Sequence, residues 1–263
     1  MIYVNLFDAA FEHLKTEDGV YSLTDNKKPE TICYSRNNMN WDGITIFTDS
    51  YLATDLPKSE HFKGLKVGWI IETRETNPGI YRDFDRYKDV FDIILTYDSE
   101  LLEMYPDKTK FYPFGGCWVF RENYGIYEKS SLISMIYSTK TITSGHKLRH
   151  ELAGIYNDIS YYGSGVRKPF GYKEEVLAPY MFTVVIENTK NPFYFSEKLL
   201  DAIAVGTIPI YWGASRIGDF FNEKGILSFE TLEEFEEIKK TLTPELYKEM
   251  LPYAKENLKL VKK

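Results

Sequence analysis

The sequence has little of what marks disulfide-rich, zinc-binding or membrane-spanning proteins. Only two of its 263 residues are cysteines, Cys33 and Cys117, so we expect neither a disulfide framework nor a zinc ligand set. No apolar run is long enough to span a bilayer, and the first residues lack the basic flank and apolar core of a signal peptide. These features predict a reduced, cytoplasmic protein without a membrane span.

Positive charge is also scarce. The chain has 32 Lys and Arg against 39 Asp and Glu, which gives a formal net charge of −7 at pH 7. Proteins that bind nucleic acids neutralise phosphates with clustered Lys and Arg, so we expect no nucleic-acid partner. Aromatic residues, in contrast, are abundant, with 21 tyrosines and 17 phenylalanines. Core packing accounts for most of them, and sugar-stacking surfaces are the alternative.

Strand and helix patterns alternate along the chain. Short apolar runs that end in polar residues or glycine predict strands, and they lie at residues 43–49, 66–72, 91–98, 110–116, 132–139, 158–165 and 181–186. Helices are predicted from Ser99, which is a candidate N-cap, from Ser144, over residues 173–180, and as a pair in the tail from residue 231, the second starting at Pro244.

A polar, turn-rich segment at residues 121–131 separates two such α/β halves. We therefore predict one domain over residues 1–125 and a second over residues 126–263, which includes the C-terminal helices. Two successive α/β halves favour an α/β fold with two Rossmann-like domains that face each other across a cleft.

The strand at residues 181–186 ends unusually, because Glu187 and Asn188 follow its apolar run directly. In parallel sheets, ligands bind beyond the carboxyl ends of the strands, where helix N-termini favour anions such as a diphosphate. Lys198 at the start of the next helix would add a positive charge, and the Glu197 carboxylate suits the vicinal hydroxyls of a ribose. The alternative is that Glu197 only complements the helix dipole while Lys198 is solvated.

The stretch YMFTVVIENTKNPFYFSEKLLDAIAVGTIPIYWGAS resembles the donor-binding motif of the α-1,3-fucosyltransferase family. Three blocks carry the resemblance: Glu187-Asn188, then Tyr194 to Lys198, then Gly206 to Gly213. The likeness covers roughly residues 132–229. The first domain matches only in outline, through a glutamate at the end of a predicted strand and a proline a little downstream.

Membership of this family would imply an inverting glycosyltransferase with the two-domain fold called GT-B. Such an enzyme moves fucose, or a related sugar, from a GDP-sugar to a hydroxyl of a glycan acceptor. The resemblance implies GDP-fucose as the donor substrate, no tightly bound cofactor and no obligatory metal, because side-chain cations can neutralise the departing diphosphate. Residues 126–263 would bind the donor, and residues 1–125 would bind the acceptor.

The resemblance also implies roles for individual residues. Lys198 and Arg149 would be the cations that contact the diphosphate; the alternative for Arg149 is a surface arginine paired with a neighbouring acid. Glu197 would hold the ribose and Tyr194 would wall the nucleotide site. The remaining donor-site residues implied by the motif are Glu187, Asn188 and Ser196. Glu187 and Asn188 would shape the loop after the strand against nucleotide or sugar, and a purely structural role stays open for both.

The base that deprotonates the acceptor is expected in the first domain. Glu72 ends an apolar strand where the family carries its proposed base, and partial desolvation there would raise its pKa towards the working pH. A structural hydrogen-bonding role is the alternative, and Arg74 and Glu75 in the loop beyond are candidates for acceptor contacts. The Asp-x-Asp pattern at residues 83–85 is interpreted as a solvated helix face, and His146 as a helix-start residue.

Three other functions compete with a fucosyltransferase. The first is a catalytically inactive protein of the same fold that binds a nucleotide sugar or glycan. The second is a transferase that uses another nucleotide sugar. The third is a phosphorylase or epimerase. The sequence argues against it, because it contains no Gly-x-Gly-x-x-Gly dinucleotide fingerprint.

Overall fold

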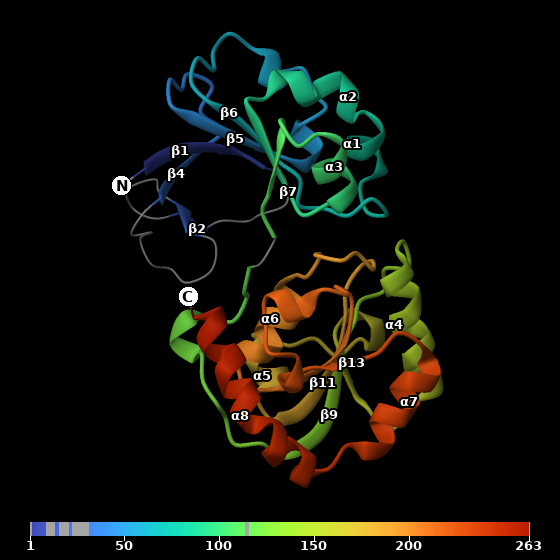
Figure 1. Cartoon of the computed structure of the whole chain (residues 1–263). Helices are drawn as coiled ribbons and strands as arrows, with labels where there is room; N and C mark the ends of the chain where they lie inside the picture. Colours follow the sequence, from blue (N-terminus) through green and yellow to red (C-terminus); the bar gives the residue numbers. More distant parts are fainter. Residues whose placement is uncertain (1, 9–13, 16–20, 23–31, 114–115, 263) are drawn as a thin grey trace. The chain divides into compact units, whose positions relative to one another are not determined.

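The computed structural model describes residues 2–8, 14–15, 21–22, 32–113 and 116–262. The chain divides into two compact units, residues 1–114 and 115–263, and each contains a parallel sheet with helices packed beside it (Figure 1). The division falls before the polar segment at residues 121–131. Residues 115–125, which the sequence assigned to the first domain, thus group with the second unit.

The first unit is built on a six-stranded sheet of parallel strands in the order β4-β1-β5-β6-β7-β8. Its strands are β1 (Ile2–Phe7), β4 (Ile32–Arg36), β5 (Ile44–Thr48), β6 (Lys66–Trp69), β7 (Ile93–Thr96) and β8 (Thr109–Phe111). Its α-helices are α1 (Pro78–Arg82), α2 (Phe84–Tyr87) and α3 (Ser99–Met104), all on one side of the sheet (Figure 1). A separate short hairpin pairs β2 (Leu14–Lys15) with β3 (Tyr21–Ser22).

Aromatic side chains fill the core between this sheet and its helices. Phe7 and Phe47 stack with ring centroids 5.2 Å apart, and Phe62 meets both rings edge-on. Edge-to-face and offset pairs are the arrangements that aromatic quadrupoles favour. In this unit, therefore, the abundant aromatic residues serve core packing.

Several sequence predictions for the first unit need correction. Strands β1 and β4 were not predicted. The N-cap of α3 is Asp98, whose carboxylate accepts a hydrogen bond from the Leu101 amide, and not Ser99. Strand β6 ends at Trp69, so Glu72 lies in the following loop. The strand predicted over residues 110–116 is the shorter β8, and residues 114–115 lie outside the described residues.

The second unit has a five-stranded parallel sheet in the order β10-β9-β11-β12-β13. Its strands are β9 (Ser131–Ile136), β10 (Ser160–Tyr162), β11 (Tyr180–Ile186), β12 (Ile208–Trp212) and β13 (Leu227–Ser228). Its α-helices are α4 (Ser144–Ile155), α5 (Lys173–Leu177), α6 (Glu197–Ala204), α7 (Leu232–Thr241) and α8 (Pro244–Val261). Pro244 occupies the start of α8 after the Thr243 cap, as predicted.

Both faces of this second sheet are covered, which explains the nearly continuous apolar sequence of β11. Val185 packs into one core with α5 and α6, whereas Phe182, Val184 and Ile186 pack into another with α4 and α7. These helix pairs lie on opposite sides of the sheet in Figure 1. The carboxyl end of β11 consequently emerges at the centre of the sheet, between β9 and β12.

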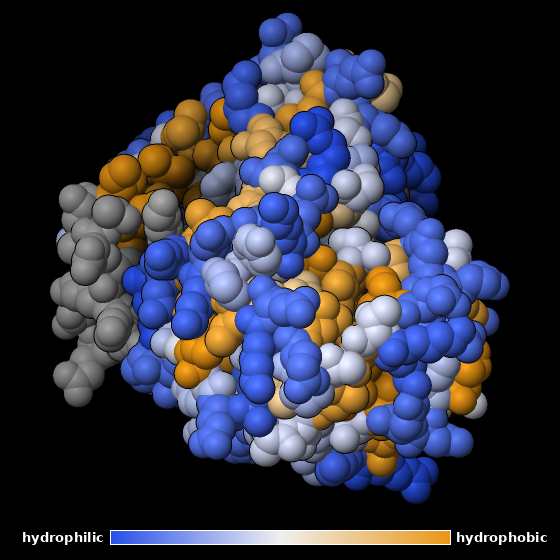
Figure 2. Space-filling model, turned by 60° about the horizontal axis from the view of Figure 1, so that its bottom comes forward, coloured by the Kyte–Doolittle hydropathy of each residue, from blue (hydrophilic) through white to orange (hydrophobic). Residues whose placement is uncertain are grey.

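The surface is mixed in character. On the face drawn in Figure 2, hydrophilic residues predominate and hydrophobic residues reach the surface between them. Among the described residues, none of the helices has the length and apolar character needed to cross a membrane.

Candidate functional site

The second unit contains a cavity of about 290 Å³ beside the central strand β11. Its walls come from the end of β9 and from β11, α4, α5 and α6. Four charged side chains line it, namely Arg149, Lys173, Glu197 and Lys198. Three cations and one carboxylate around a cavity at the strand ends make a site suited to a phosphorylated ligand that also carries hydroxyl groups.

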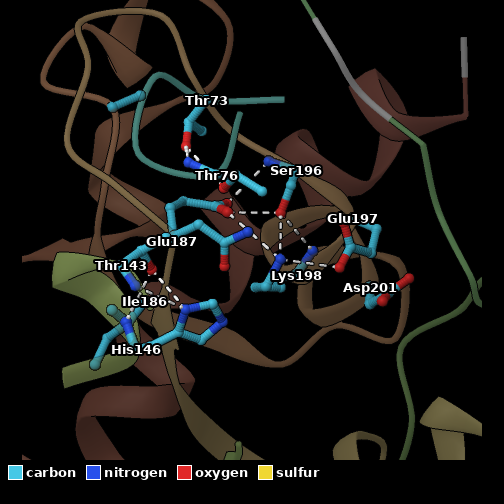
Figure 3. Close-up of polar contacts among 12 residues, drawn as sticks. Thr73, Thr76, Thr143, His146, Ile186, Glu187, Ser196, Glu197, Lys198 and Asp201 are labelled. Atoms are coloured by element: carbon cyan, nitrogen blue, oxygen red, sulfur yellow. Dashed lines mark hydrogen bonds and ion pairs between the residues drawn. The ribbon is translucent and has the colours of Figure 1, made fainter. Parts of the chain in front are cut away.

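Glu187 explains why a carboxylate follows the buried strand β11. The Glu187 side chain is completely buried, and burial raises its pKa. Its Oε1 accepts a hydrogen bond from the Ser196 amide at 2.9 Å, and its Oε2 accepts one from the Ser196 hydroxyl at 2.6 Å. Ser196 is the N-cap of α6 (Figure 3). Glu187 therefore fixes the start of α6 against the end of β11.

Lys198 lies in the first turn of α6 and is partly buried, with 26% of its side chain exposed. Its Nζ donates to the Ser196 hydroxyl and to Glu197 Oε1, each at 3.0 Å (Figure 3). Burial raises the pKa of Glu197, but the charges of Lys198 and Lys173 outweigh it and bring that pKa to about 2. Glu197 is thus ionised at neutral pH, and Lys198 is not simply solvated.

Arg149 is in the second turn of α4. Its side chain is buried, which excludes the surface ion pair considered as an alternative. Its Nε donates to the Ile186 carbonyl at 3.0 Å, and its Nη2 donates to the same carbonyl. The Nη2 group also donates to Asn188 Oδ1, at a distance of 3.1 Å. Burial lowers the pKa of Arg149, while the charges of nearby carboxylates oppose this effect. These hydrogen bonds join α4 to the end of β11.

The first turn of α4 packs very closely on the same strand end. The Gly145 amide donates to the Asn188 carbonyl at 3.0 Å, and a Cβ at Gly145 would lie only 1.8 Å from the Glu187 carbonyl oxygen. His146 Nδ1 accepts from the Thr143 amide in a capping box, so His146 is the helix-start residue that the sequence predicts. Burial is the main reason that its pKa is lowered to about 4.

The predicted donor residues thus fall into two groups within one unit. Arg149, Glu197 and Lys198 border the cavity. The other four, which are not among the cavity-lining residues, are Glu187, Asn188, Tyr194 and Ser196. Asn188 accepts a hydrogen bond from Arg149 and Ser196 accepts one from Lys198, whereas Glu187 holds Ser196. Tyr194 is buried.

Sequence reasoning missed one ion pair at this site. Lys173 of α5 lines the cavity, and its Nζ lies 2.7 Å from Oδ2 of Asp201, a fully buried residue of α6. Burial tends to lower the pKa of Lys173, but the Asp201 charge raises it above its usual value. An aspartate within the apolar run Leu199–Ala204 was the signal that could have pointed to this pair.

In the first unit, backbone hydrogen bonds fix the loop that carries Glu72. The Glu72 amide donates to Asp49 Oδ1 at 3.0 Å, and the Glu72 carbonyl accepts from the hydroxyls of Tyr81 and Tyr97. Arg74 makes two 2.8 Å hydrogen bonds to Asp98, so its guanidinium is already engaged. The sequence interpretation did not identify Asp49 as part of this loop's support.

Asp49 is an unusual residue at the end of β5. It is 5% exposed, has a φ of 38°, and its Oδ2 is buried without a hydrogen-bond partner. Burial is the main cause that raises its pKa to about 7, and the charges of Glu72 and Asp8 add to the effect. Within residues 2–8, 14–15, 21–22, 32–113 and 116–262, no group of three or more His, Cys, Asp or Glu is placed to hold a metal ion.

The fold and the cavity define an α/β protein whose second unit has, at the strand ends, a charged cavity of a kind suited to a phosphorylated, hydroxyl-bearing ligand. Residues 126–254 match the family model described as glycosyltransferase family 10 (fucosyltransferase), C-terminal part. This half of the chain belongs to that family, as the motif predicts.

Two curated relatives carry names that agree with this family. The chain is 38% identical over 79 residues to the alpha-(1,3)-fucosyltransferase FucT of Helicobacter pylori, a match that covers 28% of this chain and 16% of the relative. It is 46% identical over 44 residues to an alpha-(1,4)-fucosyltransferase of Arabidopsis thaliana, covering 17% of this chain and 11% of the relative. The matched segments thus span only a small part of these relatives.

Solved structures extend the similarity to the whole fold. A crystal structure of an alpha1,3-fucosyltransferase superposes with a TM-score of 0.58 at 20% identity, covering 88% of this chain and 79% of that chain. A crystal structure titled as alpha1,3-fucosyltransferase with GDP-fucose gives a TM-score of 0.56 at 20% identity, with coverages of 84% and 72%. These similarities confirm the predicted GT-B fold class.

Proposed function

We propose that this protein is an inverting fucosyltransferase that moves fucose from GDP-fucose to a hydroxyl group of a glycan acceptor. The observation that carries the proposal is the cation-lined cavity at the start of α6, built by the half of the chain that belongs to the fucosyltransferase family. The curated relatives are named as fucosyltransferases, and one solved neighbour is titled as a complex with GDP-fucose.

The donor would bind in this cavity with its diphosphate near the N-terminus of α6. Lys198 and Arg149 supply two positive charges there, and the first amides of α6 supply further donors. Glu197, held ionised by its lysine neighbours, accepts hydrogen bonds from the ribose hydroxyls. As the bond from the anomeric carbon to the phosphate oxygen breaks, these cations stabilise the charge that develops on GDP, and no metal ion is required.

The remaining donor residues act by positioning. Glu187 and Ser196 hold the first turn of α6, and so fix the positions of Glu197 and Lys198 in that turn. Asn188 accepts a hydrogen bond from Arg149 and thereby orients its guanidinium. Tyr194 is buried just before this turn and would support the wall of the nucleotide site from behind the residues that line the cavity.

We assign the acceptor side to the first unit, residues 1–114, and the donor side to the second unit, residues 115–263, in place of the predicted boundary after residue 125. Glu72 takes the proton from the attacking acceptor hydroxyl while the anomeric carbon inverts its configuration. The rigid support of the Glu72 loop by Asp49, Tyr81 and Tyr97 favours this role, because a general base must be held in place. Glu75 is the neighbouring carboxylate against which this assignment is tested.

We also propose that the reaction takes place in the cytoplasm. The chain has only two cysteines, Cys33 and Cys117, and both are buried, which suits a reducing compartment where disulfide frameworks are rare.

A panel of nucleotides tests the donor assignment. GDP and GDP-fucose should raise the unfolding temperature more than UDP, ADP or CMP, because a ligand at a hundred times its Kd stabilises by about 2.7 kcal/mol. Preference for UDP would overturn the fucose assignment but leave a transferase. GDP binding without any release of GDP from GDP-fucose would instead favour an inactive binding protein. Activity that disappears with a chelator and returns with metal would refute the metal-free mechanism.

A further inference from the structure

Helices α5 and α6 both line the cavity of the second unit. Helix α5 contributes Lys173 and Leu177 to the lining. Helix α6 contributes Glu197 and Lys198 from its first turn. The spacing of these side chains around a ligand therefore depends on how firmly the two helices are held to each other.

The C-terminal ends of both helices lie against residues 121–131, the polar segment that the sequence suggested as a domain boundary. The Ser130 amide donates to the carbonyl of Pro179, just beyond α5, at 2.9 Å. The Gly125 amide donates at 2.9 Å to the carbonyl of Ala204, the last residue of α6. The polar segment is thus bonded to both helix ends and is not a free linker.

Lys129 of this segment joins the two helix ends through one ammonium group. Its Nζ donates to the Ala178 carbonyl at 2.8 Å and to the Val205 carbonyl at 2.9 Å. These two residues are the C-caps of α5 and α6. The third Nζ hydrogen bond, of 2.8 Å, is to Thr207 Oγ1 at the start of β12. Unpaired carbonyls and partial negative charge at helix C-termini make them suited to a cation.

The surroundings of Lys129 are unlike those of an ion-paired lysine. All three of its acceptors are uncharged, and burial lowers its pKa to about 7. Burying a cation without a carboxylate is costly. Its hydrogen bonds to the two helix ends offset that cost, so the contacts differ from those of a solvated linker lysine.

We propose that Lys129 is a positioning residue of the donor site, which joins the ends of α5 and α6 and so sets the separation of the cavity walls that these helices form. The inference rests on the proposed function, because it takes the cavity as the nucleotide site. The competing explanation is that Lys129 only satisfies the helix-end carbonyls. The apolar core shared by α5 and α6 would then keep the cavity walls in place without it.

GDP binding to the full chain, measured by calorimetry at a temperature where each variant is folded, separates the two explanations. Lys129→Met removes the ammonium group and keeps the length of the side chain. Phe235→Leu is the matched control for lost stability. Phe235 is fully buried in the core shared with α4 and α7 on the other side of the sheet, so this variant weakens packing without touching α5 or α6. Urea unfolding gives the stability of each variant.

Chemical restoration tests the ammonium group itself. In Lys129→Cys, the thiolate displaces bromide from 2-bromoethylamine and forms a side chain that ends in an ammonium group at the length of lysine. The natural thiols, Cys33 and Cys117, are buried, and wild-type protein treated in the same way controls for their modification. If Lys129→Met does not fold, Lys129→Gln, which keeps an amide donor, takes its place with the same expectation.

We expect Lys129→Met to bind GDP about 3- to 30-fold more weakly than the wild type. Phe235→Leu should stay within about twofold of the wild type at a comparable loss of stability. Lys129→Cys should lose affinity as Lys129→Met does, and aminoethylation should restore it to within about twofold of the treated wild type.

A folded Lys129→Met protein with wild-type affinity for GDP would overturn the inference. An equal loss of affinity in Phe235→Leu would do the same, as would an aminoethylated variant that still binds weakly. A wild-type protein that does not bind GDP would instead refute the proposed function, and this inference with it.

Discussion

The two cations assigned to the diphosphate, Arg149 and Lys198, should respond differently to the same substitution. Arg149 is buried and donates to the carbonyl of the buried Ile186 and to Oδ1 of the half-buried Asn188. Leaving a buried acceptor without its donor costs about 1–3 kcal/mol. Arg149→Met should therefore lower the free energy of unfolding by about 1–3 kcal/mol through the Ile186 carbonyl, and Asn188 adds less because water can reach it.

Lys198→Met should cost less stability than Arg149→Met. Its ammonium is partly exposed, and the Ser196 hydroxyl keeps its hydrogen bond to Glu187 when the lysine is removed. Exposed ion pairs contribute about 0–1 kcal/mol, and we expect the partly buried Lys198–Glu197 pair to lie near the top of that range. Yet both variants should bind GDP more weakly by about 10- to 150-fold, because each removes a charge-assisted contact worth about 1.5–3 kcal/mol.

Urea unfolding and GDP calorimetry on the same preparations measure the two quantities separately. Arg149→Lys is the matched control, because it keeps the charge but lacks the planar group that donates from both Nε and Nη2 to one carbonyl. We expect its stability to lie between those of the wild type and Arg149→Met. An Arg149→Met variant within about 1 kcal/mol of the wild type would refute the structural role of Arg149. Equal destabilisation by Lys198→Met would refute the contrast.

Three further predictions concern single positions. Because the folded-state pKa of Asp49 is raised to about 7, the folded protein keeps a proton that the unfolded chain loses near pH 4, and stability falls as the pH rises between these values. Asp49→Asn should reduce the loss of unfolding free energy from pH 5 to pH 8 by about 2–3 kcal/mol, and an unchanged pH dependence in urea unfolding would contradict it. Gly145→Ala should destabilise the protein by about 1–3 kcal/mol because its Cβ would meet a backbone oxygen. In contrast, Gly154→Ala in the same helix, where a Cβ meets nothing within 4 Å, should be neutral or stabilising. Glu72→Gln should lower turnover about 10²–10⁴-fold with little change in GDP affinity, and an inactive Glu75→Gln beside an active Glu72→Gln would show that the base was wrongly chosen.

Local sequence was sufficient for much of the donor half. The apolar run of β11, the polar pair after it and the Ser-Glu-Lys start of α6 lie close together along the chain, so their order already indicates a strand, a loop and a helix N-terminus. The same holds for α8, whose cap and first proline are adjacent. In each case the signal and the element it predicts lie within a few residues of each other.

Contacts between distant residues decided the rest. Strands β1 and β4 owe their pairing to the parallel sheet, where Val4 lies between Tyr34 and Ile44. The role of Glu187 as the anchor of α6 appears only when the end of β11 meets Ser196.

The buried charged residues show most clearly the contrast between local sequence signals and contacts of distant residues. Lys173 and Asp201 are 28 residues apart in sequence, and nothing in the local pattern of α5 links them. Asp49 reaches the amide of Glu72 across 23 residues. The sequence by itself determined which charged residues this chain has and which of them begin or end an element. Only the tertiary structure decided which became buried and paired, because desolvation and Coulomb energies depend on distance in space and not on separation along the chain.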